Sequence, residues 1–221
     1  MRRLSFIIPT INRFEYLEPC FISLAKTIKP NGVFVHLTIV DDASEDNRTV
    51  AYIKEYTPLF VDQIDKSFKV IRTPGLCETN LKEIWSKHYN DGYDLFCNLD
   101  PDAILNPNWL IKLIELYDKL GSSSIITPFD TSAHKRKQVF LDYVSKNTIG
   151  GICMLFGRDT YKGIIEPSLF PSSAWDWEVC NKTKSFYCTS PSYIEHIGKM
   201  SSARDSNAIP LFDKAINFIG E

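Results

Sequence analysis

The sequence predicts an α/β fold, with a doubly wound, mostly parallel sheet flanked by helices in a single domain. Short apolar runs alternate with amphipathic stretches over residues 4–128, and this alternation is typical of parallel sheets. The apolar runs are nearly continuous, without the every-second-residue pattern of a half-exposed strand. Because continuous runs indicate burial on both faces, we expect helices on both sides of the sheet.

Each element of this regular part has its own signal. The run at 35–40 is rich in β-branched residues and stops at an acidic pair. Ser44 is placed to N-cap the helix that follows, and Pro107 suits the first turn of a later helix. The patterns predict strands at 4–8, 35–40, 68–72, 94–99 and 124–127, and helices at 15–29, 45–56, 76–89 and 106–120.

Beyond residue 128 the pattern is weaker. Residues 130–145 are polar and rich in Lys and Arg, and we assign no element to them. The remaining elements that we expect are a Gly-Gly-bearing strand at 148–156, a helix near 177–184, a strand near 193–195 and a tail with helical apolar spacing at 209–219.

Composition excludes some classes of function. With 221 residues and a net charge of −2, the chain is not of the kind that mainly coats nucleic acid. Its ten glycines include no Gly-x-Gly, which disfavours a P-loop kinase or a dinucleotide-binding dehydrogenase. No apolar run approaches the roughly 20 residues of a membrane span, and the first run is too short for a signal peptide. Six cysteines without a C-x-x-C pair are expected to be free thiols. We therefore expect a soluble, cytoplasmic protein.

Carboxylates follow two of the predicted strands. Asp41 and Asp42 end the second strand, and Asp100 and Asp102 follow the fourth. The carboxyl ends of parallel strands meet at one edge of the sheet, which is where α/β proteins bind ligands. Such clustering is unfavourable unless a cation or hydrogen-bond donors lie between the carboxylates. The pattern D-x-D therefore indicates Mg²⁺ or Mn²⁺ held against substrate phosphates, and the alternative is a set of loop carboxylates that cap helices.

Four segments resemble a known family, the inverting family 2 glycosyltransferases of the GT-A fold. The segments, in the order of that family, are S-F-I-I-P-T-I-N-R at 5–13, T-I-V-D-D-A-S at 38–44, N-L-D-P-D at 98–102 with P-N-W-L at 107–110, and W-D-W-E-V-C at 175–180. The chain departs from the family pattern at Ile11, Ala43 and Trp175, where the family has tyrosine, glycine and glutamate. The last departure leaves either Asp176 or Glu178 as the general base.

The resemblance implies roles for particular residues. It places Pro9, Thr10, Arg13, Asp41 and Asp42 in the nucleotide pocket, with Asp42 bonded to the base. It places Asp100 near the ribose, Asp102 on a Mn²⁺ or Mg²⁺ ion, and His196 as a candidate second ligand of that ion. It implies that Asp176, or else Glu178, takes the proton of the acceptor hydroxyl in a single displacement.

The resemblance also implies a division of the chain and a set of partners. Residues 1–128 would form the nucleotide-binding half, and residues 129–221 the acceptor-binding half and tail. The donor would be a nucleotide sugar, most simply a UDP-sugar, and the acceptor a saccharide, glycolipid or glycoprotein in polysaccharide or glycoconjugate assembly. The basic run at 134–137 is either a solvated loop or a peripheral contact with a membrane.

Two other functions remain open at this stage. One is a catalytically silent domain that binds nucleotide sugars. The tryptophan at position 175, where the family has glutamate, is compatible with this function. The other is a sugar nucleotidyltransferase. That class needs a Gly-rich loop near the N-terminus, where this chain has Pro9-Thr10-Ile11-Asn12-Arg13.

Overall fold

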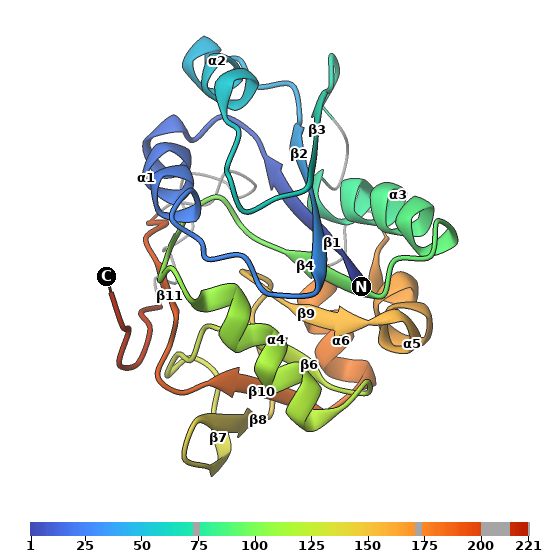
Figure 1. Cartoon of the computed structure of the whole chain (residues 1–221), viewed down its shortest axis with the longest axis vertical. Coiled ribbons are helices and arrows are strands. Elements are labelled where there is room, and N and C mark those ends of the chain that lie inside the picture. Colours follow the sequence, from blue (N-terminus) through green and yellow to red (C-terminus); the bar gives the residue numbers. More distant parts are fainter. Residues whose placement is uncertain (73–75, 171–173, 200–212, 221) are drawn as a thin grey trace.

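A mixed nine-stranded sheet runs through the molecule, with helices packed on both of its faces (Figure 1). This computed structural model describes residues 1–72, 76–170, 174–199 and 213–220. In spatial order the strands are β3 (Gln63–Phe68), β2 (Val33–Asp41), β1 (Arg2–Thr10), β4 (Leu95–Asn98), β9 (Leu155–Gly157), β6 (Ile125–Thr127), β10 (Phe186–Thr189), β8 (Tyr143–Lys146) and β7 (Arg136–Val139).

The helices are distributed over the whole chain. They are α1 (Phe14–Leu24), α2 (Asn47–Glu55), α3 (Leu76–Asn90), α4 (Trp109–Leu120), the short α5 (Arg158–Thr160) and α6 (Trp175–Lys182). Helix α5 continues into a π turn, η1 (Tyr161–Ile165), and a 3₁₀ turn, η2 (Glu166–Ser168). A separate two-stranded sheet joins β5 (Ala103–Leu105) to β11 (Ile194–His196). No helix in the described part of the chain is long and apolar enough to cross a bilayer.

The predicted parallel arrangement is confirmed. Strands β3, β2, β1 and β4 are mutually parallel, and β6 is parallel to β10. Antiparallel β9 lies between β4 and β6, and antiparallel β8 and β7 extend the far edge. The register pairs Thr10 with Asp41 and Ile7 with Asn98. The residues that follow these strands therefore meet at one edge of the sheet.

Two apolar cores explain why the strands read as continuous apolar runs. Phe6 of β1 packs with Trp109 of α4 in the core that α1, α2 and α4 cover. Its neighbour Ile7 lies in the second core, with Trp85 of α3 and residues of η1 and α6. Successive strand residues point to opposite faces of a sheet, so a sheet covered on both faces buries every one of them.

Several predicted elements need correction. The third strand is β3 at 63–68 and not 68–72. It is an edge strand in which four of six residues are polar, whereas Val70 and Ile71 are 94% and 82% exposed. The N-cap of α2 is Asp46, whose carboxylate accepts from the Arg48 amide. Ser44 instead bonds to Asp41.

The second half of the chain departs further from the prediction. The unassigned segment 130–145 contains β7 and the start of β8, which form a hairpin. The Gly-Gly pair lies before β9 and not within a strand. The tail at 213–219 is not helical and instead bridges to Thr131 through Ala215, while 209–212 lie outside the described residues. All six cysteines are free thiols, as predicted.

Candidate active site at the carboxyl edge of the sheet

The turn after β1 interlocks with the turn after β2. The Asn12 amide donates to Ser44 Oγ at 2.6 Å, and Asn12 Oδ1 accepts from the Glu45 amide at 2.9 Å. Ser44 also donates from its amide to Asp41 Oδ2 at 3.1 Å and from its hydroxyl to Asp41 Oδ1. Asp41 therefore serves to fix this turn, since its carboxylate is buried and bonded within it.

The same turn holds uncommon backbone angles. Asn12, Arg13 and Ala43 have φ of 50°, 67° and 58°, in the left-handed region that favours glycine. The glycine of the family pattern at position 43 is explained by this angle. Asp42 follows Asp41 and is fully buried, with its amide donating to Thr10 O at 2.9 Å. Pro9 and Thr10 are also buried in β1, so the predicted nucleotide-pocket residues are brought together.

Asp102 is the centre of a charged cluster. Its Oδ2 lies 2.5 Å from Arg13 Nη2 and 3.3 Å from His196 Nε2. The other ring nitrogen of His196, Nδ1, lies 3.2 Å from Asp213 Oδ1. Asp102 itself is 4% exposed. Residues from three distant parts of the chain thus converge here, because β11 pairs with β5 directly after Asp102.

The electrostatics of the cluster follow from its geometry. Burial raises the pKa of Asp102, but the bond from His196 and the charge of Arg13 outweigh it and hold the pKa below its usual value. Burial lowers the pKa of His196, and its bonds to Asp102 and Asp213 overcome this and raise it to about 10. Loss of hydration, followed by the charge of Asp102, raises the pKa of Asp100 well above normal. Such crowding of carboxylates favours a bound cation.

The donor atoms suit a hard divalent cation. Asp102 Oδ1 is buried and has no hydrogen-bond partner among the described residues, while Asp100 and His196 lie beside it. Carboxylate oxygen and imidazole nitrogen are ligands that Mn²⁺ accepts. Within the described ranges, no three His, Cys, Asp or Glu side chains are arranged as a complete metal site. Mg²⁺ usually keeps several waters and is bound through one or two carboxylates together with substrate phosphates.

Asp176 lies in the first turn of α6 and faces the same edge. Its Oδ2 accepts from the Gly151 amide at 3.1 Å, and the Gly151 carbonyl accepts from Asn98 Nδ2 at 2.5 Å. After burial and the charge of Asp102, the charge of Asp176 also contributes to the raised pKa of Asp100. Glu178 is two residues further along α6, and such positions are about 200° apart around a helix.

The tryptophans on either side of Asp176 differ. Trp175 is 5% exposed and packs edge-on against Trp85, with ring centroids 6.4 Å apart. Trp177 is 57% exposed. The tryptophan at position 175, where the family has glutamate, is thus a core residue that fixes the start of α6.

Comparison with known proteins identifies the family. The model described as "Glycosyl transferase family 2" matches residues 5–166. The chain belongs to glycosyl transferase family 2. No curated protein matches it.

Solved structures of this fold class resemble the chain at low identity. The structure of S. aureus TarS 1–349 in complex with UDP-GlcNAc is 18% identical, with a TM-score of 0.66, and the alignment covers 93% of this chain and 62% of that one. GalNAc-T7 with UDP, GalNAc and Mn²⁺ is 12% identical, with a TM-score of 0.61 and coverage of 90% and 44%. The likeness shows the GT-A fold, and the chain spans less than two thirds of the length of these structures.

Some residues of the site were not predicted from the sequence. Gly198 lies so close to Asp102 that a Cβ on it would be 2.0 Å from Oδ2. Asp213 lies in the tail, 17 residues beyond its partner His196. Asn98 lies in the N-L-D-P-D motif but has no predicted role, and its side chain also accepts from the Met154 amide at 3.1 Å. Only Gly198 carried a signal, since a glycine two residues after a candidate ligand is compatible with close backbone approach.

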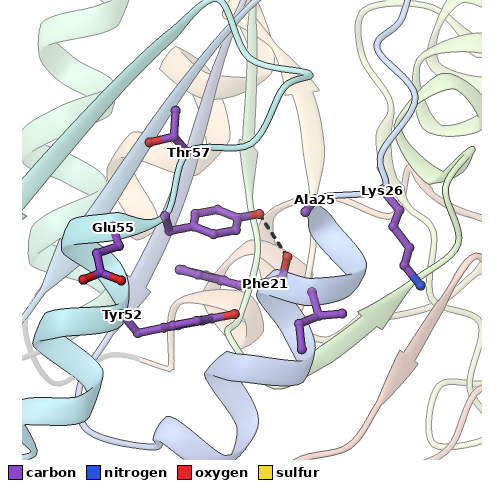
Figure 2. A pocket seen from close by; sticks show the side chains of 8 residues that line it. Phe21, Ala25, Lys26, Tyr52, Glu55 and Thr57 are labelled. Carbon is purple, nitrogen blue, oxygen red and sulfur yellow. Dashed lines mark hydrogen bonds between the residues drawn. The ribbon is translucent and has the colours of Figure 1, made fainter.

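A separate hollow of about 490 Å³ lies between α1 and α2 (Figure 2). Phe21 and Tyr52 line it, with Lys26 and Glu55 at its margin, and Tyr56 closes one side by donating to Phe21 O at 3.2 Å. These residues lie in the C-terminal halves of the two helices or directly after them. None of the acidic residues of the carboxyl edge lines this hollow, and we place the chemistry at that edge.

Proposed function

We propose that the chain is a metal-dependent inverting glycosyltransferase that moves a sugar from a nucleoside-diphosphate sugar to an acceptor hydroxyl. The observation that carries the proposal is the meeting of Asp42, Asp102 and Asp176 at one edge of the sheet. Family membership supports the class of reaction. The acceptor would be a saccharide, glycolipid or glycoprotein, in polysaccharide or glycoconjugate assembly.

The residues after β1 and β2 would bind the nucleotide. Asp42 would accept a hydrogen bond from the base, with Pro9, Thr10 and Arg13 around it and Asp100 near the ribose. The UDP-GlcNAc in TarS and the UDP in GalNAc-T7 favour a uridine donor. The turn is braced by Asp41 and Asn12, so little of it needs to be ordered when the donor binds.

Asp102 and His196 would hold Mn²⁺ or Mg²⁺, which as a Lewis acid neutralises charge on the departing diphosphate. For His196 to act as a ligand its ring must be neutral, with Nε2 free of a proton and Nδ1 donating to Asp213. The Mn²⁺ in the GalNAc-T7 structure supports manganese.

Asp176 would act as the general base. Its carboxylate takes the proton of the acceptor hydroxyl, that oxygen forms a bond to the anomeric carbon, and the bond from this carbon to the diphosphate oxygen breaks. One such displacement inverts the anomeric configuration. General-base assistance contributes about 10²–10⁴ in rate. Asp176 is preferred over Glu178 because its carboxylate accepts from the Gly151 amide, and Gly151 in turn bonds to Asn98 at the end of β4.

The test is a donor screen followed by two matched variants. Nucleotide sugars are incubated with Mn²⁺, and released nucleoside diphosphate is measured with and without acceptor saccharides. Asp176→Asn should lose at least about a hundredfold in turnover while binding UDP with unchanged affinity, and Glu178→Gln should remain active. Normal turnover by Asp176→Asn would refute the assignment of the base. Donor binding by the wild type without turnover on any acceptor would instead favour the catalytically silent domain.

A further inference from the structure

The tip of the β7–β8 hairpin exposes apolar side chains where a turn usually exposes polar ones. The Phe140 amide donates to Tyr143 O at 2.9 Å, which closes a turn with Leu141 and Asp142 at its centre. Such central positions normally carry Gly, Asn, Asp, Ser or Pro. Here Leu141 is 99% exposed, with Val139 at 66% and Phe140 at 41%. Packing within the chain accounts for part of the Phe140 ring, which contacts Tyr143, but not for Val139 and Leu141.

The tip is held firmly in this position. The Phe140 ring stacks on Tyr143 with centroids 4.3 Å apart and planes 12° from parallel. Asp142 bonds through both carboxylate oxygens to Lys119 Nζ, at 2.9 and 3.0 Å. Strand β8 pairs with β10, so the hairpin is an extension of the main sheet. The apolar residues are therefore presented at a defined place, at the margin of the molecule (Figure 1).

Lysines surround the base of the tip. Lys137 precedes Val139 by two residues, and its Nζ donates to Lys184 O at 3.3 Å, which brings Lys184 alongside. Lys135 and Lys119 are exposed on the same part of the molecule. The carboxylate within the turn itself, that of Asp142, is neutralised by Lys119. The chain as a whole has a net charge of −2, so this excess of positive charge is local.

We propose that this hairpin docks the protein on an anionic lipid surface. The side chains of Val139, Phe140 and Leu141 would enter the interfacial layer, and lysines such as Lys137 and Lys184 would contact lipid phosphates. Exposed apolar residues with a basic rim are the combination that binds such surfaces. The proposal does not depend on sugar transfer, and its test uses no sugar substrate.

Pairing of the hairpin edge with a second copy of the chain is the main alternative, and features of β7 oppose it. Strand β7 is the last strand of the sheet, and such edges attract other strands. Its pairing with β8 is irregular between Arg136 and Gln138, which places Lys137 at a bulge. Bulges and lysines on an edge strand are devices that prevent edge-to-edge pairing.

The test is sedimentation of the full chain with vesicles of phosphatidylcholine alone or mixed with phosphatidylglycerol. The wild type should bind the mixed vesicles, and binding should weaken as salt is raised. Leu141→Asp should weaken binding at least about tenfold, since it removes a fully exposed leucine from the interface. Leu59→Asp is the matched control, because Leu59 is 96% exposed in a loop away from the hairpin.

A second pair of variants tests the charges. Lys137→Gln should weaken binding about fivefold, the loss expected for one lysine at an anionic surface. Lys82→Gln, at an exposed position on α3, should have no effect. Unchanged thermal midpoints would show that all four variants fold.

Three results would overturn the proposal. One is the absence of binding of the wild type to phosphatidylglycerol vesicles, and another is equal binding to neutral vesicles. The third is an equal loss for Leu59→Asp and Leu141→Asp. A wild-type dimer in solution that Leu141→Asp dissociates, without vesicle binding, would assign the tip to self-association instead.

Discussion

The exchange Gly198→Ala perturbs the acidic cluster through a single methyl group. A Cβ at this position would lie 2.0 Å from Asp102 Oδ2, 2.7 Å from its Cγ and 2.9 Å from Arg13 Nη2. Ordinary van der Waals contact begins near 3.4 Å, so the methyl and Oδ2 overlap by about 1.4 Å. Either the Asp102 carboxylate turns away, or the backbone at 197–199 moves and strains the bond from the Ile197 amide to Asp102 O, now 2.8 Å.

The free-energy cost of moving the Asp102 carboxylate can be estimated from the hydrogen bonds that it would lose. Oδ2 of Asp102 accepts from Arg13 and His196, and a hydrogen bond to a charged group contributes about 1.5–3 kcal/mol. If the carboxylate turns away, returning it to its present position for the ion would cost about this much, which predicts about a 10- to 100-fold weaker affinity for UDP with Mn²⁺. Isothermal titration calorimetry measures this directly. Gly163→Ala is the control, since nothing lies within 4 Å of a Cβ there. Wild-type affinity in Gly198→Ala would show that Asp102 does not need its present position.

Three further predictions concern titration and buried charge. Asp213→Asn should lower the pKa of His196 from about 10, which NMR titration measures, and an unchanged pKa would rule out the contact. In the wild type, the raised pKa of His196 stabilises the folded state below about pH 6.5, and this stability is lost as pH rises through about 10. Burial lowers the pKa of His88 to about 4, so the free energy of unfolding should fall by about 3 kcal/mol between about pH 6.5 and pH 4. In urea unfolding, His88→Gln should show a shallower pH dependence of this free energy than the wild type. Equal pH dependence in the two proteins would contradict the prediction. Lys146→Met should cost up to about 3–5 kcal/mol, because the fully buried Asp130 carboxylate loses its ammonium partner and keeps only the Arg136 guanidinium. The double variant with Asp130→Asn should recover part of that loss, and chemical denaturation measures both.

The first half of the fold was predictable because local signals and burial agree there. The strands at 4–8 and 35–40 are covered on both faces, so their apolar runs report directly on their structure. Strand β3 was misplaced because an edge strand needs few apolar residues, and the exposed Val70 and Ile71 gave a misleading signal. Periodicity detects burial, and it fails where a strand is only partly buried.

The site was predictable in part, for a related reason. Asp42 and Asp102 follow strands, and strand ends converge by the rules of parallel sheets. The contact of His196 with Asp213 depends on how the tail folds back over Thr131, and no local pattern encodes that path. Likewise, the hairpin at 136–146 has few apolar residues on β7 and no turn residues such as Asn-Gly, so its sequence does not read as a hairpin.

The left-handed residues of the turns after β1 and β2 have a consequence for how this protein tolerates substitution. Positive φ costs a non-glycine residue roughly 1–2 kcal/mol, and Asn12, Arg13 and Ala43 all carry it. In the folded protein, the hydrogen bonds that join Asn12 to the loop after β2 offset this cost before any ligand binds. A substitution that removes these bonds leaves the unfavourable backbone angles without compensation, so we expect this turn to tolerate few changes.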